Sequence, residues 1–227
     1  MKWKFFMLAL LGSLAVSAQF NGNKEQRTHG MLHIIEYQLP INGTPYVNEI
    51  FKKGTITIQN RDSKLVEDRL MRFNAFTGEM EYLGPDGKER TLLKRENITV
   101  ELDGMAYEVH PYKEGREINR AYFIRLNDGD KAVVYKKPIK YFRKGAMPEH
   151  GYEDAREPEY FDASEYYLRM DGASMVPLAM NKKGLLSALH NHREDVKKYV
   201  SDRHLNLRDA ADAMQVIAYY NRLVAVN

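Results

Sequence analysis

The sequence predicts an α+β protein, in which an antiparallel β-meander (a twisted open sheet or a half-barrel) precedes a C-terminal bundle of about three short helices. First, Asp-Gly pairs recur between stretches in which apolar and polar residues alternate, a pattern typical of tight β-hairpins. Second, the apolar spacing changes after Leu178 from every second residue to every third or fourth, which is typical of helices.

The chain is expected to begin with a signal peptide. Lys2 and Lys4 precede an apolar run from Phe5 to Val16, and small residues end the run at Ala18. The run is too short to span a bilayer, and no cysteine follows it, which excludes a bacterial lipoprotein. We therefore expect cleavage after Ala18 and a soluble, exported chain without a transmembrane segment, periplasmic or extracellular.

The remaining chain is expected to form two parts. Residues 19–180 form an antiparallel β domain with an acidic loop at 143–163, and residues 181–227 form a helical segment packed on the sheet. The loop holds two prolines, two glycines and many acids, which favours a solvated insertion over a functional lid.

Charge and cysteine content exclude several functions. The formal net charge is only +3 and both signs are interspersed, so nothing favours a nucleic-acid partner. The absence of cysteine excludes thiol catalysis, iron–sulfur clusters and thiolate metal sites. Export without any cysteine fits a bacterial periplasm or envelope better than a secreted animal protein.

The clearest hairpin surrounds Asp103-Gly104. A two-residue type I′ turn needs positive φ at both positions, which Asp and Gly adopt at low cost. One side of this ribbon is then apolar and the other mostly polar, so a shift by one residue would mix the two faces. The predicted cross-strand pairs are Leu102 with Met105, Val100 with Tyr107 and Ile98 with Val109.

Three further hairpins are predicted on the same grounds, around Thr77-Gly78, Asp128-Gly129 and Asp171-Gly172, with another turn at Pro85-Asp86-Gly87. Both faces of the Asp128-Gly129 hairpin are apolar, so we expect it to be covered on both sides. Pro177 is expected at a sheet edge or at the end of a strand. The predicted pairs are Ala75 with Met80, Phe73 with Tyr82, Ile124 with Val133, Tyr122 with Tyr135, Leu168 with Met175 and Tyr167 with Val176.

The elements follow in order. Asn181 is expected to cap the first helix, Val196 and Val200 to form the apolar stripe of the second, and Asn206 or Asp209 to open the third. Strands are predicted at 31–39, 51–59, 64–76, 79–83, 97–103, 105–112, 119–127, 130–142, 164–170 and 173–178, with a short one near Leu92.

The tail KKGLLSALHNHREDVKKYVSDRHLNLRDAADAMQVIAYYNRL resembles the end of a group of uncharacterised exported proteins of Gram-negative envelopes, in its Lys-Lys-x-Leu-Leu element, its Lys-Lys-Tyr helix and its closing Tyr-Tyr-Asn-x-Leu. LMRFNAFTGEMEYL is similar to their central hairpin. The resemblance implies a sheet followed by helices and an envelope location, and it transfers no catalytic residue. His190 and Asn191 stand where that group has an aromatic residue and a proline.

Candidate catalytic and metal-binding residues are few. The best metal candidate is the cluster of His190, His192, Glu194, Asp195 and His204, but its first two histidines are two residues apart and would point to different sides of a helix. We therefore expect no metal and no cofactor. Glu79 and Glu81 share a strand face, as glycosidase carboxylates can, although exposed acids are usually solvent contacts. Motifs for nucleophilic serines or phosphate loops are absent.

Aromatic residues on the apolar strand faces are the ligand-binding candidates: Phe73, Tyr82, Tyr107, Tyr122 and Tyr135. They could line an apolar groove inside a curved sheet, or they could form an ordinary core between sheet and helices. Residue types alone leave both interpretations open.

The leading hypothesis is a non-enzymatic envelope protein that binds a protein partner or an apolar ligand through its sheet. One alternative is a periplasmic hydrolase that uses Glu and His near the 143–163 loop, and another is a structural subunit of a surface assembly. A continuous apolar cavity would favour ligand binding, a filled core with an exposed apolar patch a protein partner, and a convergent Glu/His cluster an enzyme.

Overall fold

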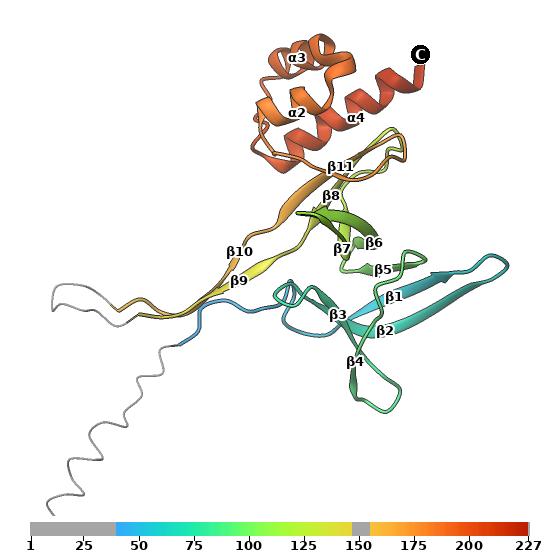
Figure 1. Cartoon of the computed structure of the whole chain (residues 1–227), viewed down its shortest axis with the longest axis vertical. Coiled ribbons are helices and arrows are strands. Elements are labelled where there is room, and N and C mark those ends of the chain that lie inside the picture. The colour runs from blue at the N-terminus through green and yellow to red at the C-terminus, as the bar shows by residue number, and fades with distance from the viewer. Residues whose placement is uncertain (1–39, 147–154, 227) are drawn as a thin grey trace, which may run out of the picture. The chain divides into compact units, whose positions relative to one another are not determined.

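A computed structural model of the chain describes residues 40–146 and 155–226. The predicted signal peptide, its cleavage after Ala18 and the predicted strand at 31–39 lie outside these residues. All described residues belong to one compact unit, 39–227. The fold class is confirmed, because this unit is a curled antiparallel sheet of ten strands, a half-barrel, followed by helices (Figure 1).

The ten strands lie in the order β12-β11-β8-β7-β6-β5-β1-β2-β3-β4, and each strand pairs antiparallel with its neighbours. The meander is interrupted once, because β1 lies between β2 and β5. The strands are β1 (Lys52–Gln59), β2 (Lys64–Asn74), β3 (Glu79–Leu83), β4 (Glu89–Thr91), β5 (Ile98–Leu102), β6 (Met105–Glu114), β7 (Glu117–Arg125), β8 (Ala132–Lys137), β11 (Glu165–Met170) and β12 (Val176–Pro177).

Two more strands form a separate ribbon, β9 (Lys140–Arg143) and β10 (Glu159–Asp162). β10 lies inside the segment that the sequence predicts as a loop at 143–163. Prolines favoured a loop there, but Pro158 only precedes the strand, and its carbonyl accepts the N–H of Asn42 at 2.9 Å. The ribbon continues the line of β8 and β11 beyond the main sheet (Figure 1).

The Asp103-Gly104 hairpin is confirmed. The φ angles of the two residues are 55° and 73°, as a type I′ turn requires. Leu102 pairs with Met105 and Val100 with Tyr107, so the predicted register holds. Pro177 also lies, as predicted, on the edge strand β12.

The Thr77-Gly78 prediction has the wrong register, by two residues. Phe73 pairs with Met80 rather than with Tyr82, so the loop has four residues. The cause is Asn74, whose side-chain oxygen accepts the N–H groups of Phe76 and Thr77, both at 3.1 Å, and so holds a wider turn. A shift by two residues keeps each side chain on its predicted face.

The register predicted for the Asp128-Gly129 hairpin is wrong by three residues. Because three is an odd number, the shift places side chains that were predicted on one face of the sheet on opposite faces. Ile124 pairs with Lys136, so Tyr122 and Tyr135 lie on opposite sides of the sheet. Asn127 holds the wider loop, because its side chain donates to the carbonyl of Ala132 at 3.0 Å and accepts the N–H of Val134 at 2.8 Å.

The Asp171-Gly172 prediction is wrong by one residue. Leu168 pairs with Val176 rather than with Met175. The N–H of Ala173 bonds the carbonyl of Met170 at 2.8 Å, so the chain turns back later than in a two-residue loop. The extra residue leaves Met175 buried on the face that holds Tyr167.

The helices follow the prediction with one addition. They are α2 (Lys182–Ala188), α3 (Arg193–Asp202) and α4 (Ala210–Val226), with an unpredicted 3₁₀ turn, η1 (His190–His192). Asn181 caps α2 through the N–H of Gly184 at 2.9 Å. Asp209, and not Asn206, caps α4 by accepting the N–H groups of Ala211 and Asp212.

The helices pack against β8 and β11 (Figure 1). Val134 and Leu168 from these strands share one buried cluster with Leu185, Val196 and Ile217 from the helices. Asn221 of α4 fixes the contact, since its side chain accepts the N–H of Ala132 at 2.7 Å and donates to the same residue's carbonyl at 2.9 Å. In the described residues, no helix has the length and apolar content needed to cross a membrane.

Candidate functional site

The ligand-binding candidates predicted from the sequence divide between the two faces of the sheet. Phe73, Tyr107 and Tyr122 are almost fully buried inside the half-barrel, with ring centroids of Phe73 and its neighbours 5.2 and 5.8 Å apart. Tyr82 is partly buried against the same cluster. Phe73, Tyr107 and Tyr122 pack against one another as core, although Phe73 and Tyr122 also line a pocket of about 170 Å³. Tyr82 lines another pocket, of about 290 Å³.

Tyr135, the fifth candidate, belongs to the opposite face. It forms an outer aromatic cluster with Tyr112, Phe123 and Tyr167, which come from β6, β7 and β11. Phe123 lies at its centre, with ring centroids 5.3 to 6.3 Å from the three tyrosines. Each tyrosine hydroxyl donates to a carboxylate: Tyr112 to Glu114 at 2.8 Å, Tyr135 to Glu108 at 3.0 Å and Tyr167 to Glu165 at 2.9 Å.

Glu108 on β6 is the most highly bonded acid of this face. Its carboxylate receives hydrogen bonds from His110 Nε2 at 2.7 Å and from Tyr135, and Arg125 lies 3.7 Å away. Burial alone would raise the pKa of Glu108, but these bonds and the charges of His110 and Arg125 outweigh burial and lower the pKa below its usual value. Burial also raises the pKa of Tyr135 to about 12, so its hydroxyl stays protonated as a donor.

A groove of about 570 Å³, the outer groove, lies beside this cluster. The buried Tyr112 and Met175 line it on the outer face, whereas the exposed Ile118, which pairs with Lys113, has its side chain on the other face of β6 and β7. His110, Lys113 and Arg169 are the basic residues that line it. The sequence did not indicate this groove, because its walls come from β6, β7 and the β11–β12 turn, which are far apart in the chain.

The Glu108–His110 pair does not complete a hydrolytic site. Ser174 lines the same groove, but no hydrogen bond joins it to His110 in the described residues. A serine hydrolase needs its histidine within hydrogen-bond reach of the nucleophile. Glu149 and His150, which belong to the loop invoked for the predicted hydrolase, lie outside the described residues.

The β9–β10 ribbon, the aromatic ribbon, exposes large side chains on both faces. Tyr141 lies 6.0 Å from Phe161 and Phe142 lies 4.9 Å from Tyr160, measured between ring centroids. Tyr141 is 54% exposed, Phe161 40% and Phe142 36%. Sequence reasoning missed this surface, although the repeated Tyr-Phe pair at 141–142 and 160–161 was a usable signal.

Hydrogen bonds show which way the backbone of the ribbon faces. On β10, the N–H of Tyr160 bonds the carbonyl of Asn42, on the side away from β9. In an antiparallel pair, two directly opposite residues either both point their N–H and C=O groups at the partner strand or both point them away from it. Phe142 lies opposite Tyr160, so its N–H and C=O also point away from the partner strand, β10. Lys140, two residues earlier, faces the same way and donates its N–H to Ala75. No described residue bonds Phe142 on this outer edge of β9.

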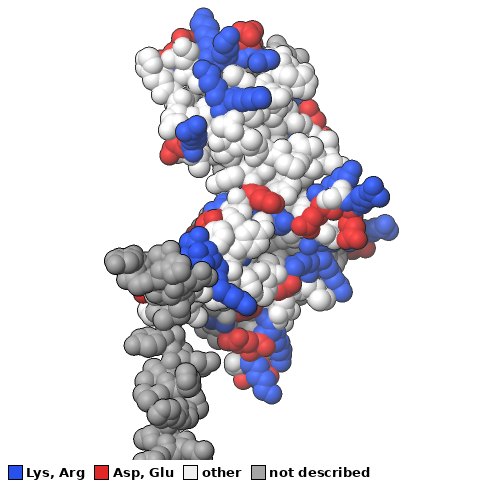
Figure 2. Space-filling model, turned by 60° about the vertical axis from the view of Figure 1, so that its left-hand side comes forward, with Lys and Arg blue, Asp and Glu red and all other residues white. Residues whose placement is uncertain are grey.

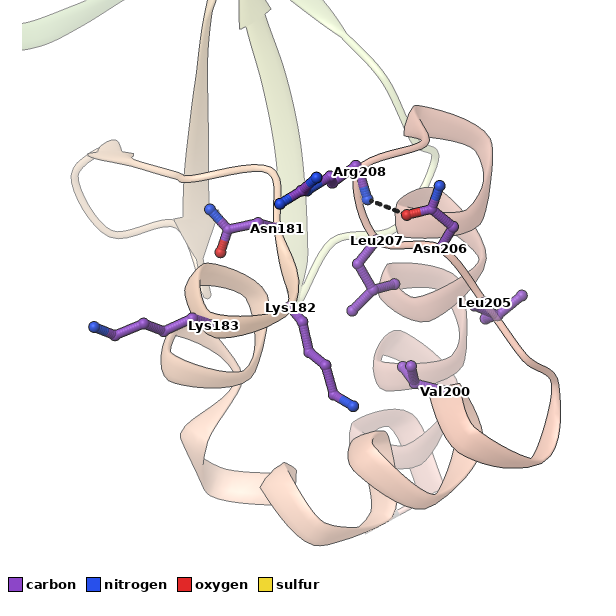
Figure 3. Close-up of a pocket in the computed structure, with 8 residues that line it drawn as sticks. All are labelled: Asn181, Lys182, Lys183, Val200, Leu205, Asn206, Leu207 and Arg208. Carbon is purple, nitrogen blue, oxygen red and sulfur yellow. Dashed lines mark hydrogen bonds between the residues drawn. The ribbon is translucent and has the colours of Figure 1, made fainter.

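A third concave surface lies among the helices. This pocket of about 360 Å³ is lined by Lys182, Lys183 and Arg208 (Figure 3). Figure 3 shows Lys183 directed away from the pocket and Arg208 extended towards Asn181. Lys and Arg side chains gather over the helical segment in Figure 2. All three basic side chains are exposed, so the pocket holds no buried polar group that would define a ligand.

The histidines considered as metal ligands are spread over the helical segment. His192 Nδ1 lies 3.6 Å from Asp195, and its ring packs on Tyr220. Within residues 40–146 and 155–226, no three His, Cys, Asp or Glu side chains converge on a point where they could hold a metal ion. The chain matches no protein-family model, and comparisons with curated proteins and with solved structures found no match.

Proposed function

We propose that the protein is an exported, non-enzymatic binding protein of the bacterial envelope that captures an extended segment of a protein partner on the outer edge of β9. The observation that carries the proposal is this edge, where the N–H and C=O of Phe142 have no partner in the described residues and exposed aromatic side chains lie on both faces. An extended segment of another protein can pair with such an edge and add a strand to the ribbon.

The charges of the ribbon do not protect this edge. Natural proteins block edge strands with charged side chains, especially lysine. Here Lys140 turns inward and donates to the carbonyls of Thr44 at 2.8 Å and Tyr46 at 2.6 Å. Arg143 is paired with Glu159 on the neighbouring strand. The aromatic rings, together with the exposed Lys144 directly after β9, are therefore what a partner would meet beside the open backbone groups.

The packing of Phe73, Tyr107 and Tyr122 against one another supports a protein partner over an apolar ligand inside the sheet, where the pockets beside these rings are small, at about 170 and 290 Å³. Export rests on the basic, apolar and small-residue order of residues 1–18 and on the resemblance of the tail to exported envelope proteins. Without a bonded nucleophile beside His110, the hydrolase alternative has less support.

The test uses the full chain in the bacterium that produces it. A photoreactive benzoylphenylalanine replaces Tyr141, and in a control it replaces Val66, an apolar residue of β2 with a similar exposure of 52%. We expect one protein to be cross-linked reproducibly from position 141 and not from position 66. A lack of any adduct at 141, or the same adducts at both positions, would contradict the proposal.

Two variants in the Tyr141-labelled chain then separate backbone pairing from side-chain contact. Phe142→Pro removes the ring and also the N–H, and because that N–H faces away from β10, the ribbon should keep its ladder. Phe142→Ala removes the ring and keeps the N–H. We expect Phe142→Pro to abolish the adduct and Phe142→Ala to reduce it, with the melting temperature little changed in both. Equal adduct from Phe142→Pro and Phe142→Ala would show that strand addition is not the mode of binding.

A further inference from the structure

We propose that the segment captured on the outer edge of β9 is the C-terminal end of a partner protein, whose last residue places an apolar side chain in a pocket beside Ala75. This inference rests on the proposed function, because it concerns the same edge, and it adds which part of a partner binds there and in which direction. Two features carry it. The edge is closed at one end, and an apolar pocket of about 170 Å³ lies at the closed end.

The outer edge of β9 is closed on the side of Lys140. The backbone N–H of Lys140 faces this edge and donates to the carbonyl of Ala75 at 3.0 Å. Ala75 belongs to the turn between β2 and β3, so this turn occupies the edge beside Lys140. An added segment that pairs with Phe142 therefore meets the turn as soon as it passes Tyr141.

This short opening favours antiparallel pairing. In an antiparallel pair, the N–H and C=O of one residue can both bond to the single residue directly opposite, whereas the slanted bonds of a parallel pair join one residue to two residues of its neighbour. A parallel segment would have to extend on both sides of Phe142, including the closed side. An antiparallel segment runs against β9, from Lys144 towards Lys140, so the end that meets the turn is its C-terminal end.

The last residue of such a segment would lie opposite Tyr141. Directly opposite residues of two paired strands have their side chains on the same face, and neighbouring residues alternate between the faces. The partner's last side chain would therefore point to the face of Tyr141, and Tyr141 is one of the residues that line the pocket. The side chain before it would point to the other face, beside the ring of Phe142.

The pocket lies where β9 leaves the main sheet. In the described residues, β7 pairs with β8 at Ile124 and Arg125 but not at Tyr122. Because the two strands separate there, side chains from inside the half-barrel can meet those of the ribbon at the open edge of β7. Phe73, Ala75 and Tyr122 line the pocket from the half-barrel, and Ile139 and Tyr141 line it from the ribbon.

The size and chemistry of the pocket suit one apolar side chain. Its volume of about 170 Å³ is below the usual range of small-molecule sites, roughly 300–1,000 Å³, but apolar cavities of about 150 Å³ take up benzene. The ammonium of Lys137, which also lines the pocket, lies 4.0 Å from the centroid of the Tyr112 ring and is engaged there. We therefore expect leucine or phenylalanine as the partner's last residue.

The test maps where the partner is attached. Benzoylphenylalanine replaces Tyr141 in one full-length chain and the exposed Lys144 in another, both in the bacterium that produces the protein, and mass spectrometry locates the cross-linked residue of the partner. We expect adducts from position 141 within about three residues of the partner's C-terminus, and adducts from position 144 a few residues earlier, because strands advance about 3.4 Å per residue.

The possible results separate this inference from the proposed function. Adducts at internal residues of the partner, or adducts in the reverse order along it, would overturn the inference and leave strand capture standing. A lack of adducts at both positions would contradict strand capture itself, and this inference with it.

Variants then test the pocket and the chain end, with the label at Lys144 so that it does not fill the pocket. Ile139→Phe adds volume to one wall and should lower the yield of adduct about tenfold, since one apolar side chain then stays in water. Ile139→Val, the matched control, leaves the pocket open and should keep the adduct. A Gly-Ser-Gly extension at the partner's C-terminus should abolish the adduct, because it would run into the Ala75 turn. Equal yields from the two Ile139 variants, or an unchanged yield with the extended partner, would overturn the inference.

Discussion

At the scale of single residues, two tyrosines inside the half-barrel differ in whether the hydroxyl has a hydrogen-bond acceptor. Tyr122 OH donates to the carbonyls of Leu92 at 3.3 Å and Leu93 at 3.4 Å. Tyr107 OH is buried without any hydrogen-bond partner in the described residues. Burial raises the pKa of both phenols, so both hydroxyls stay protonated and need an acceptor.

The two residues should therefore respond differently to loss of the hydroxyl. Tyr107→Phe should leave the free energy of unfolding unchanged or raise it by about 1 kcal/mol, because an unsatisfied buried donor is removed. Tyr122→Phe should lower it by about 1 kcal/mol, because a hydrogen bond is lost. Urea unfolding of both variants measures the difference. Greater destabilisation by Tyr107→Phe than by Tyr122→Phe would mean that Tyr107 OH has an acceptor after all.

The predicted turns show how far local sequence specifies register. Asp103-Gly104 was predictable because the two residues alone satisfy the turn geometry. The registers after Asn74 and Asn127 were not, because each depends on a side-chain amide that bonds backbone groups two or more residues away. Alternating apolar residues identify the faces of each strand but do not reveal such bonds.

At the scale of elements, β6, β7 and β8 are joined by the Glu108 carboxylate. It accepts from His110 on its own strand and from Tyr135 on β8, and it faces Arg125 on β7. Because the pKa of Glu108 is lowered in the folded chain, its ionised form stabilises the fold at pH values above its usual pKa of 4.5. This contribution is lost as the pH falls through the lowered pKa.

Glu108→Gln should therefore destabilise the protein at pH 7 by about 1.5–3 kcal/mol, the usual contribution of hydrogen bonds to a charged group. The difference from the natural chain should shrink below pH 4. Urea unfolding at pH 7 and pH 3 measures it, with Glu101→Gln, at an exposed position of β5, as the control. A deficit that stays the same at both pH values would show that the carboxylate charge is not what stabilises this face.

The candidate sites were less predictable than the elements. Apolar alternation marked Phe73 and Tyr107 as inward-facing, and the same pattern serves a core and a binding groove equally well. For Tyr122 both faces of the predicted hairpin are apolar, so alternation did not assign its side. The outer groove forms only when β6 lies near the β11–β12 turn, which a strand pattern does not show. β10 was not predicted because Pro158, just before it, and the acids around it are typical of loops, whereas Asn42 supplies the strand's second neighbour.

At the scale of the whole molecule, two signals together were sufficient to predict an antiparallel sheet followed by helices. Short turns imply antiparallel neighbours, and the change of apolar spacing after Leu178 indicates where the helices begin. The placement of β1 between β2 and β5 was not predictable. That pairing joins segments more than 40 residues apart, such as Ile56 and Val100, and no turn signal links them.

Export is the prediction that concerns the complete chain. The protein recovered from the periplasm or medium of its native cells should begin at Gln19 when its N-terminus is sequenced, because a signal peptidase cuts after small residues. Ala18→Phe should retain residues 1–18, since a bulky side chain would not fit the peptidase. Recovery of a chain that begins at Met1 from the cytoplasm would contradict export.

The central claim is that the outer edge of β9 is open and takes up a strand from a partner. Amide hydrogen exchange, measured by NMR on the purified chain and on the cross-linked complex, tests it most directly. We expect the Phe142 amide to exchange rapidly in the free chain while those of Tyr141 and Arg143, which face β10, are protected, and we expect it to become protected in the complex. A Phe142 amide that is already protected in the free chain, or that still exchanges rapidly in the complex, would contradict the claim.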